Sequence, residues 1–295
     1  MQFYGFDLDH TLGDFSYLDK YLDFFKFEEP IKASDSLKTK LDNGYKVFIK
    51  NVVAGIHRNN SVNSVNKTNK NSYIPTGICK IFNPELLEFF VNNKAKFESG
   101  EFKAIIYSNN TYYETLQFAK DVIEQYVGCE IFCYLMHWNH KFRNDEIVKG
   151  DPGNARKTWA ILKKGFETGC GGEPEPANVK FYDDLIHEEL VSTLGDNYVH
   201  VTAYYALPST DLLMESVLMA CEESGLDEDI EYHKVLTEYW DTPIPIGGLT
   251  DILDILGEYI EYNVKQKGGY IKKTKKRSRS KPRRKRRTNK KNRIN

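Results

Sequence analysis

The 295-residue sequence lacks any run of 18 apolar residues, which is about the length needed to cross a bilayer. Its first residues enter a strand-like pattern directly, without the charged and apolar regions of a signal peptide. We therefore expect a soluble, non-secreted protein that is cytoplasmic or nuclear and has no membrane partner. The length suits one sizeable domain with additions, or two small domains.

Cysteine is scarce and shows no paired spacing. The five cysteines are Cys79, Cys129, Cys133, Cys170 and Cys221, an odd number without a CxxC motif. This usage predicts no disulfide framework and fits a reducing compartment. Cys129, Cys133, His137 and His140 are zinc-ligand types. However, residues 130–136 read as a strand, in which positions four apart lie about 13 Å from each other, so we do not expect a zinc site.

The end of the chain lacks acidic residues. Residues 265–295 carry 17 Lys and Arg and no Asp or Glu, whereas residues 1–264 carry 24 Lys and Arg against 42 acids. The net charge of -1 therefore combines a part of +17 with a part of -18. A segment of this composition cannot bury enough apolar surface to fold, so we expect a disordered basic tail.

The basic tail has several possible roles. Its charge is typical of a nuclear-import signal or of a segment that binds nucleic acid non-specifically through the phosphates. It could also lie over the acidic body of the same chain. Because no aromatic residue follows Tyr270, base stacking is not expected. The tail resembles, in composition, the endings of many proteins of large DNA viruses, and this resemblance would place the protein in an infected host cell or a virion.

Strand-like and helix-like segments alternate through most of the chain. The predicted strands are residues 2–9, 103–108, 130–136, 179–185 and 197–205, and the predicted helices between them are residues 83–100, 111–128 and 154–169. Asn83 is a suitable N-cap with Pro84 in the first helical position. This alternation predicts an α/β protein with a Rossmann-like, mostly parallel sheet flanked by helices.

Two further segments lie outside this pattern. Residues 14–56 read as helical, with Ser34 or Asp35 as an N-cap, and the Asn- and Ser-rich residues 58–72 are expected to form a solvated loop. We divide the chain into an α/β core (1–12 and 81–206), an insertion or cap (13–80), a helical extension (207–264, with helical patterns at 210–224 and 249–262) and the tail (265–295).

Polar side chains end three of the predicted strands. They are Asp7 and Asp9, Ser108 and Asn109, and Asp183 and Asp184. In parallel sheets these ends line the ligand crevice. Four carboxylates gathered there would repel one another, and Mg²⁺, which binds carboxylates, water and phosphate, would balance them. The predicted metal-binding residues are Asp7, Asp9, Asp183 and Asp184, and which member of the last pair is the direct ligand is left open.

Four motifs in this order resemble the haloacid dehalogenase (HAD) superfamily of phosphotransferases. They are DLDHT, with Asp7, Asp9 and Thr11; AIIYSNN, with Ser108; NARKTW, with Lys157; and KFYDDL, with Asp183 and Asp184. The segments NPELLEFF and FYDDLIHEEL look most like the carboxy-terminal-domain phosphatase-like and small magnesium-dependent phosphatase branches. The resemblance covers residues 2 to about 205 and implies a HAD-like core with a cap inserted after the first strand.

The resemblance also implies a reaction. The protein would be a phosphoric monoester hydrolase with Mg²⁺ as cofactor, and Asp7 would form an aspartyl-phosphate. Asp9 would protonate the leaving oxygen and then deprotonate the attacking water. Ser108 would hold one phosphate oxygen, and Lys157 would neutralise another and restrain Asp7. Mg²⁺ would lie between the Asp7 side chain, the Asp9 carbonyl and the acidic pair. The expected substrate-binding residues are Thr11, Ser108, Asn109 and Lys157.

Neighbouring residues offer alternatives for some of these roles. The competitors are Lys149, Arg156, Lys163 and Lys164 for Lys157, and Asn109, Asn110 and Thr111 for Ser108. A run of charges on a helix is usually its solvated face, and Asn or Thr often caps the next helix. His10 and His187 flank the acidic motifs, where a histidine most often has a local hydrogen-bonding role.

Three functions remain open from the sequence. The branch resemblance favours a phosphatase that acts on phosphoserine or phosphothreonine in proteins, whereas the tail suits a nucleic-acid end phosphatase or a nucleotidase. The third is a non-catalytic HAD-fold interaction protein that binds nucleic acid through its tail. The intact set of Asp7, Asp9, Ser108 and the acidic pair argues against this third function, because a scaffold has no need to hold four carboxylates together.

Removal of residues 265–295 tests the tail. We expect the full-length chain to bind a labelled DNA duplex with an affinity that falls with salt, by a log–log slope of about -0.9 for each phosphate neutralised. The truncated chain should lose most of this binding. Fluorescence anisotropy at several salt concentrations measures both, and a flat salt response of the full-length chain would exclude nucleic acid as the tail's partner.

Overall fold

The centre of the molecule is a five-stranded parallel sheet. The computed structural model describes residues 1–15, 17–27, 32–66, 81–143, 157–205, 210–240, 248–249 and 252–253. The strands are β1 (Gln2–Phe6), β2 (Phe102–Tyr107), β3 (Phe132–Met136), β4 (Val179–Asp183) and β5 (Tyr198–His200), in the order β3-β2-β1-β4-β5. The predicted α/β class and all five strands are confirmed, although β5 covers only three residues of the predicted range 197–205.

The sheet separates two hydrophobic cores, because successive residues of a strand point to opposite faces. Tyr4 and Phe6 of β1 pack in a core with α3 (Pro84–Asn92), α4 (Lys94–Glu98) and α5 (Tyr113–Val127). Phe3 lies on the other face, in a core with α7 (Trp159–Cys170) and α8 (Glu188–Leu194). The helix predicted over residues 83–100 is divided at Asn93 into α3 and α4, and its predicted cap is confirmed, since Asn83 accepts a hydrogen bond from the Glu85 N–H.

Helix α7 lies directly on β3. A Cβ atom at Gly165 would lie 2.6 Å from Met136 Cε, and one at Gly169 would lie 2.4 Å from Tyr134 Cβ, so only glycine allows this approach. Thr158 caps the helix by accepting a hydrogen bond from the Ile161 N–H. The helix begins at Trp159 rather than within residues 154–158, of which 154–156 lie outside the described residues.

The insertion after β1 is helical. It contains α1 (Leu18–Leu22) and the long helix α2 (Asp35–Asn66), whose N-cap is Ser34, since its Oγ accepts a hydrogen bond from the Leu37 N–H. The predicted loop over residues 58–72 is wrong for residues 58–66, which belong to α2. Once a helix is nucleated, each added residue gains a backbone hydrogen bond, so Asn and Ser extend it at little cost. Residues 67–72 lie outside the described range.

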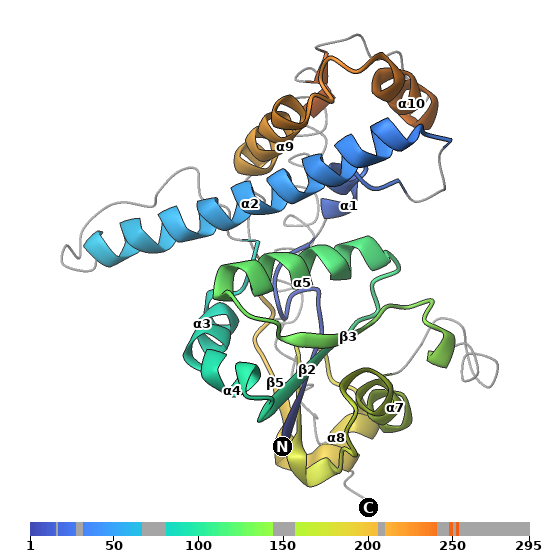
Figure 1. Cartoon of the computed structure of the whole chain (residues 1–295). Helices are drawn as coiled ribbons and strands as arrows, with labels where there is room; N and C mark the ends of the chain where they lie inside the picture. Colours follow the sequence, from blue (N-terminus) through green and yellow to red (C-terminus); the bar gives the residue numbers. More distant parts are fainter. Residues whose placement is uncertain are drawn as a thin grey trace, which may run out of the picture.

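The insertion and the C-terminal extension form one helical unit. Helix α2 packs against α9 (Thr210–Ser224), which confirms the helix predicted at 210–224, and α10 (Ile230–Trp240) follows. The Tyr232 hydroxyl donates to the Phe24 carbonyl at 3.0 Å, and the Tyr239 hydroxyl donates to Asp23 at 2.9 Å. Figure 1 shows this unit on the α5 side of the sheet. The helical pattern at 249–262 falls mostly outside the described residues.

No helix in the described parts of the chain is long and apolar enough to cross a membrane.

One expectation about cysteine is wrong, because Cys133 of β3 and Cys170 at the end of α7 form a disulfide bond, with their Cα atoms 5.3 Å apart. The two residues are 37 positions apart in sequence, and only the packing of α7 on β3 brings them together.

The disulfide gives a prediction about stability. Loss of a cross-link that closes 37 residues should cost roughly 3–4 kcal/mol in the chain-entropy account. We therefore expect Cys133→Ser to lower the Tm by about 6–12 °C in a thermal unfolding experiment. Reductant should lower the wild-type Tm to the same value and leave the variant unchanged. Cys129→Ser, at a free cysteine, is the matched control. A wild-type Tm that does not respond to reductant would contradict the bond.

Candidate functional site

The candidate site lies at the carboxyl ends of β1 and β4. The strands β2 and β3 lie on one side of β1, and β4 and β5 lie on the other. The order in which strands are added to the sheet therefore changes sides between β1 and β4. Ligands of open parallel sheets bind at such a reversal. Asp7 follows β1 directly, and its N–H donates to the Tyr182 carbonyl of β4 at 2.9 Å. Asp183 ends β4, so the two acids emerge on neighbouring strands.

A buried lysine lies between these two acids. Lys157 Nζ is 2.6 Å from Asp7 Oδ1 and 2.7 Å from Asp183 Oδ2. Lys157 is 1% exposed and Asp183 is 0% exposed, so both charges are removed from solvent. His187 Nε2 lies 3.3 Å from Asp183 Oδ2, which places this histidine at the site as well.

Lys157 is the basic residue of its region that the structure brings to the acids. Lys163 pairs with Glu167 and Glu175, and Lys164 lies over the ring of Phe142. The other two candidates, at positions 149 and 156, lie outside the described residues.

Burial and neighbouring charges raise the pKa of two of the acids, Asp7 and Asp184, whereas the pKa of Asp183 is lowered. Burial raises the pKa of Asp7 to about 6. The positive charge of Lys157 opposes this rise, and the negative charge of Asp183 adds to it. Burial also raises the pKa of Asp184, again with a contribution from Asp183. For Asp183 itself, burial alone would raise the pKa, but the hydrogen bond from His187 and the charge of Lys157 outweigh it and lower the pKa.

Three carboxylates are arranged as a metal site would require. Asp7, Asp183 and Asp184 each offer an oxygen atom, and these atoms lie within 4.8 Å of one another. Asp7 is buried, and its Oδ1 contacts Lys157 Nζ at 2.6 Å. A carboxylate has about four lone-pair sites, so this contact leaves room for a metal ion. One lysine does not balance this many acids. An oxygen-only donor set with excess negative charge fits Mg²⁺.

The carboxylate of Asp9 has a different environment. It is not one of the three grouped acids, and its Oδ2 accepts a hydrogen bond from Asn110 Nδ2 at 3.1 Å. Burial raises its pKa, and the bond from Asn110 opposes this rise. The structure therefore places the Asp9 side chain outside the group of three acids, while the predicted metal contact of the Asp9 carbonyl stays a prediction.

Thr11 joins the loops that follow β1 and β4. Its hydroxyl donates to Asp184 Oδ1 at 3.3 Å and accepts from the Asp184 N–H at 3.0 Å. Thr11 is fully buried, and its carbonyl accepts from Asn83 Nδ2. These contacts hold Asp184 in place, while a direct contact of Thr11 with substrate stays a prediction.

The loop after β2 contributes Ser108 to the same edge of the sheet. Ser108 is 1% exposed, and its Oγ accepts a hydrogen bond from the Asn110 N–H at 3.0 Å. Asn109 Oδ1 accepts from the guanidinium group of Arg143 at 2.6 Å, and Arg143 also donates to the Ser108 carbonyl. The sequence reasoning did not identify Arg143, because it belongs to no motif and follows β3 by several residues.

The histidines and cysteines considered as zinc ligands do not form a site. Cys133 is bonded to Cys170, and His140 Nε2 lies 3.1 Å from the Tyr134 hydroxyl. Among the residues that the structure describes, Asp7, Asp183 and Asp184 are the only group of three or more His, Cys, Asp or Glu that could share an ion. His10 has a local role, since its Nδ1 lies 3.2 Å from the Tyr204 carbonyl.

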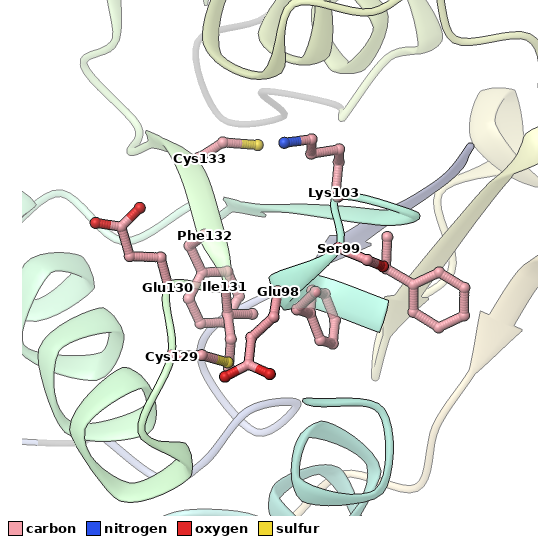
Figure 2. A pocket seen from close by; sticks show the side chains of 11 residues that line it. Glu98, Ser99, Lys103, Cys129, Glu130, Ile131, Phe132 and Cys133 are labelled. Atoms are coloured by element: carbon pink, nitrogen blue, oxygen red, sulfur yellow. The ribbon is translucent and has the colours of Figure 1, made fainter. Parts of the chain in front are cut away.

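One large pocket lies away from these residues. It has a volume of about 570 Å³ and is lined by the amino-terminal ends of β2 and β3, at the opposite end of the strands from Asp7 and Ser108. Figure 2 shows Cys133 and Lys103 pointing toward one another in this pocket, with Glu98 and Cys129 also lining it. Its lining combines Lys103 with Glu98 and Glu130 and includes none of the residues of the candidate site.

No family model, no curated protein and no solved structure matches the chain.

Proposed function

We propose that the protein is a Mg²⁺-dependent phosphatase that hydrolyses phosphate monoesters through an aspartyl-phosphate. The observation that carries this proposal is the burial of Lys157 between Asp7 and Asp183 at the carboxyl ends of two neighbouring strands. These residues are the ones that the HAD resemblance assigns to catalysis. The grouping of Asp7, Asp183 and Asp184 around a single lysine also supports the proposal, because a metal ion would balance their excess negative charge.

The side chains take the following roles in the proposal. Asp7 attacks phosphorus through a carboxylate oxygen, and the leaving oxygen receives a proton from Asp9. Asp9 then removes a proton from the water that attacks the aspartyl-phosphate, which releases inorganic phosphate and restores Asp7. Lys157 holds the Asp7 carboxylate in place, and the Ser108 hydroxyl positions a phosphate oxygen.

Asp7, Asp183 and Asp184 would hold Mg²⁺ in this proposal. The ion would supply positive charge that offsets the negative charge of the phosphate and of the acids around it. Thr11 and His187 would then act indirectly, because they hold Asp184 and Asp183 through the contacts described above.

The substrate in this proposal is a phosphoserine or phosphothreonine of a protein, on the basis of the branch resemblance. The 17 positive charges of residues 265–295 favour one second candidate, a phosphate at the end of a nucleic acid. A non-catalytic interaction protein is disfavoured, since burying Lys157 with two acids costs desolvation energy without any gain for binding elsewhere.

The nucleophile gives the first test. Asp7→Asn should lower kcat for an aryl phosphate by at least about a thousandfold, because an amide cannot form the phosphoenzyme. The control is Asp196→Asn, which changes an exposed acid just before β5, at the opposite end of the strands from the site, and should leave kcat unchanged. Release of the aryl alcohol is followed by absorbance. Equal activity of Asp7→Asn and wild type would refute the proposed nucleophile.

Metal removal gives the second test. We expect EDTA to abolish hydrolysis and Mg²⁺ to restore it. Asp184→Asn should raise the Mg²⁺ concentration needed for half-maximal activity by roughly 10–100-fold, since it removes one charged ligand. A second readout needs no activity: Mg²⁺ should raise the Tm of the wild type more than that of Asp184→Asn. Full activity in EDTA would exclude the metal from the reaction.

A further inference from the structure

Arg143 restrains the loop that follows β2. The side chain is 1% exposed, and its guanidinium group donates to the Ser108 carbonyl at 2.7 Å and to Asn109 Oδ1 at 2.6 Å. The guanidinium carbon lies 5.2 Å from the ring centre of Tyr107 and 5.1 Å from that of Trp138. Directional hydrogen bonds and two aromatic contacts together hold a planar guanidinium in one orientation.

Asn110 extends this restraint to Asp9. Its N–H donates to Ser108 Oγ at 3.0 Å, and its carbonyl accepts from the Trp138 N–H at 2.8 Å. Its side-chain oxygen accepts from the Tyr112 N–H at 2.8 Å. With these three groups bound, the remaining amide nitrogen is aimed at Asp9 Oδ2, 3.1 Å away.

We propose that Arg143 is a positioning residue of the site: it sets the loop of Ser108, Asn109 and Asn110, and through Asn110 it orients the carboxyl group of Asp9. This inference rests on the proposed function for its catalytic consequence. In this scheme Arg143 acts through the loop it holds, and its side chain is only 1% exposed.

The choice of residue supports a directional role. A buried cation costs desolvation energy, and an apolar side chain of similar size would fill the same space more cheaply. Lysine would keep the charge but could not bridge two acceptors with the fixed geometry of a guanidinium. The hydrogen bonds to Ser108 and Asn109 are therefore the feature that distinguishes Arg143 from either substitute.

The consequence for catalysis is a loss of rate rather than of binding. Proton transfer requires Asp9 to lie within hydrogen-bond reach of the leaving oxygen, and a misplacement of about 1 Å can cost on the order of a hundredfold. Binding of the phosphate to a metal ion on Asp7, Asp183 and Asp184 would change little, because these acids follow β1 and β4 and lie outside the loop that Arg143 holds. The expected signature is a lower kcat with a nearly constant KM.

A double-mutant cycle tests the link through Asn110. We expect Arg143→Lys and Asn110→Ala each to lower kcat about 10–100-fold, with KM within about threefold of wild type. Because both act on Asp9, the double variant should be no more than about threefold slower than the slower single variant. Lys141→Met, which removes an exposed charge two residues away, is the control and should behave as wild type. A kcat for Arg143→Lys within twofold of wild type, or losses that multiply, would overturn the proposal.

A second readout does not depend on activity. The side-chain amide pair of Asn110 in a ¹H–¹⁵N spectrum, assigned by its loss in Asn110→Ala, should shift in Arg143→Lys and not in Lys141→Met. Asn109→Ala removes one acceptor of Arg143 and should shift the same pair if Arg143→Lys does not fold. An unmoved pair overturns the link, whereas a shifted pair in a protein without phosphatase activity supports the link and refutes only the proposed function.

Discussion

The structure around the site depends on one buried cation, the Lys157 ammonium group between Asp7 and Asp183. Taking one positive and two negative groups out of water is costly, and the cost is recovered only if the distances are short and the remaining lone pairs are used. Asp183 meets this condition, since it also accepts from the Leu185 N–H and contacts His187. The pKa values follow this arrangement, since the pKa of Asp183 is lowered by its hydrogen bonds and by Lys157, whereas burial raises the pKa of Asp7.

The position of Lys157 is set by elements that carry no charge. It lies immediately before α7, and α7 approaches β3 closely because Gly165 and Gly169 leave room for the side chains of β3. The disulfide between Cys133 and Cys170 joins the other end of the helix to the same strand. Register between β1 and β4 then places the two acids on either side of the ammonium group. A shift of α7 along β3 would move Lys157 away from Asp7 and Asp183. The packing of α7 on β3 therefore determines the geometry of the site.

Local patterns carry the parts of this arrangement that could be predicted. The apolar runs that end in acids predict β1 and β4, and Asn83 with Pro84 predicts the start of α3, because each signal depends on neighbours in sequence. The extension of α2 through its Asn- and Ser-rich end could not be predicted, since it depends on a helix nucleated earlier in the chain. The disulfide and Arg143 were missed for a related reason: their partners are fixed by tertiary packing and not by spacing.

In the proposed function, electrostatics would link Mg²⁺ to the phosphate. The acidic body, with its net charge of -18 over residues 1–264, disfavours any anion, but charges more than about 8 Å away are largely screened at physiological ionic strength. What decides binding is the set of charges within the site. There Lys157 is already shared by two carboxylates, so it has little attraction left for a phosphate dianion. A divalent cation on Asp7, Asp183 and Asp184 would reverse the sign of the local field. Metal and phosphate should therefore bind with positive coupling, and each should raise the affinity for the other by the same factor.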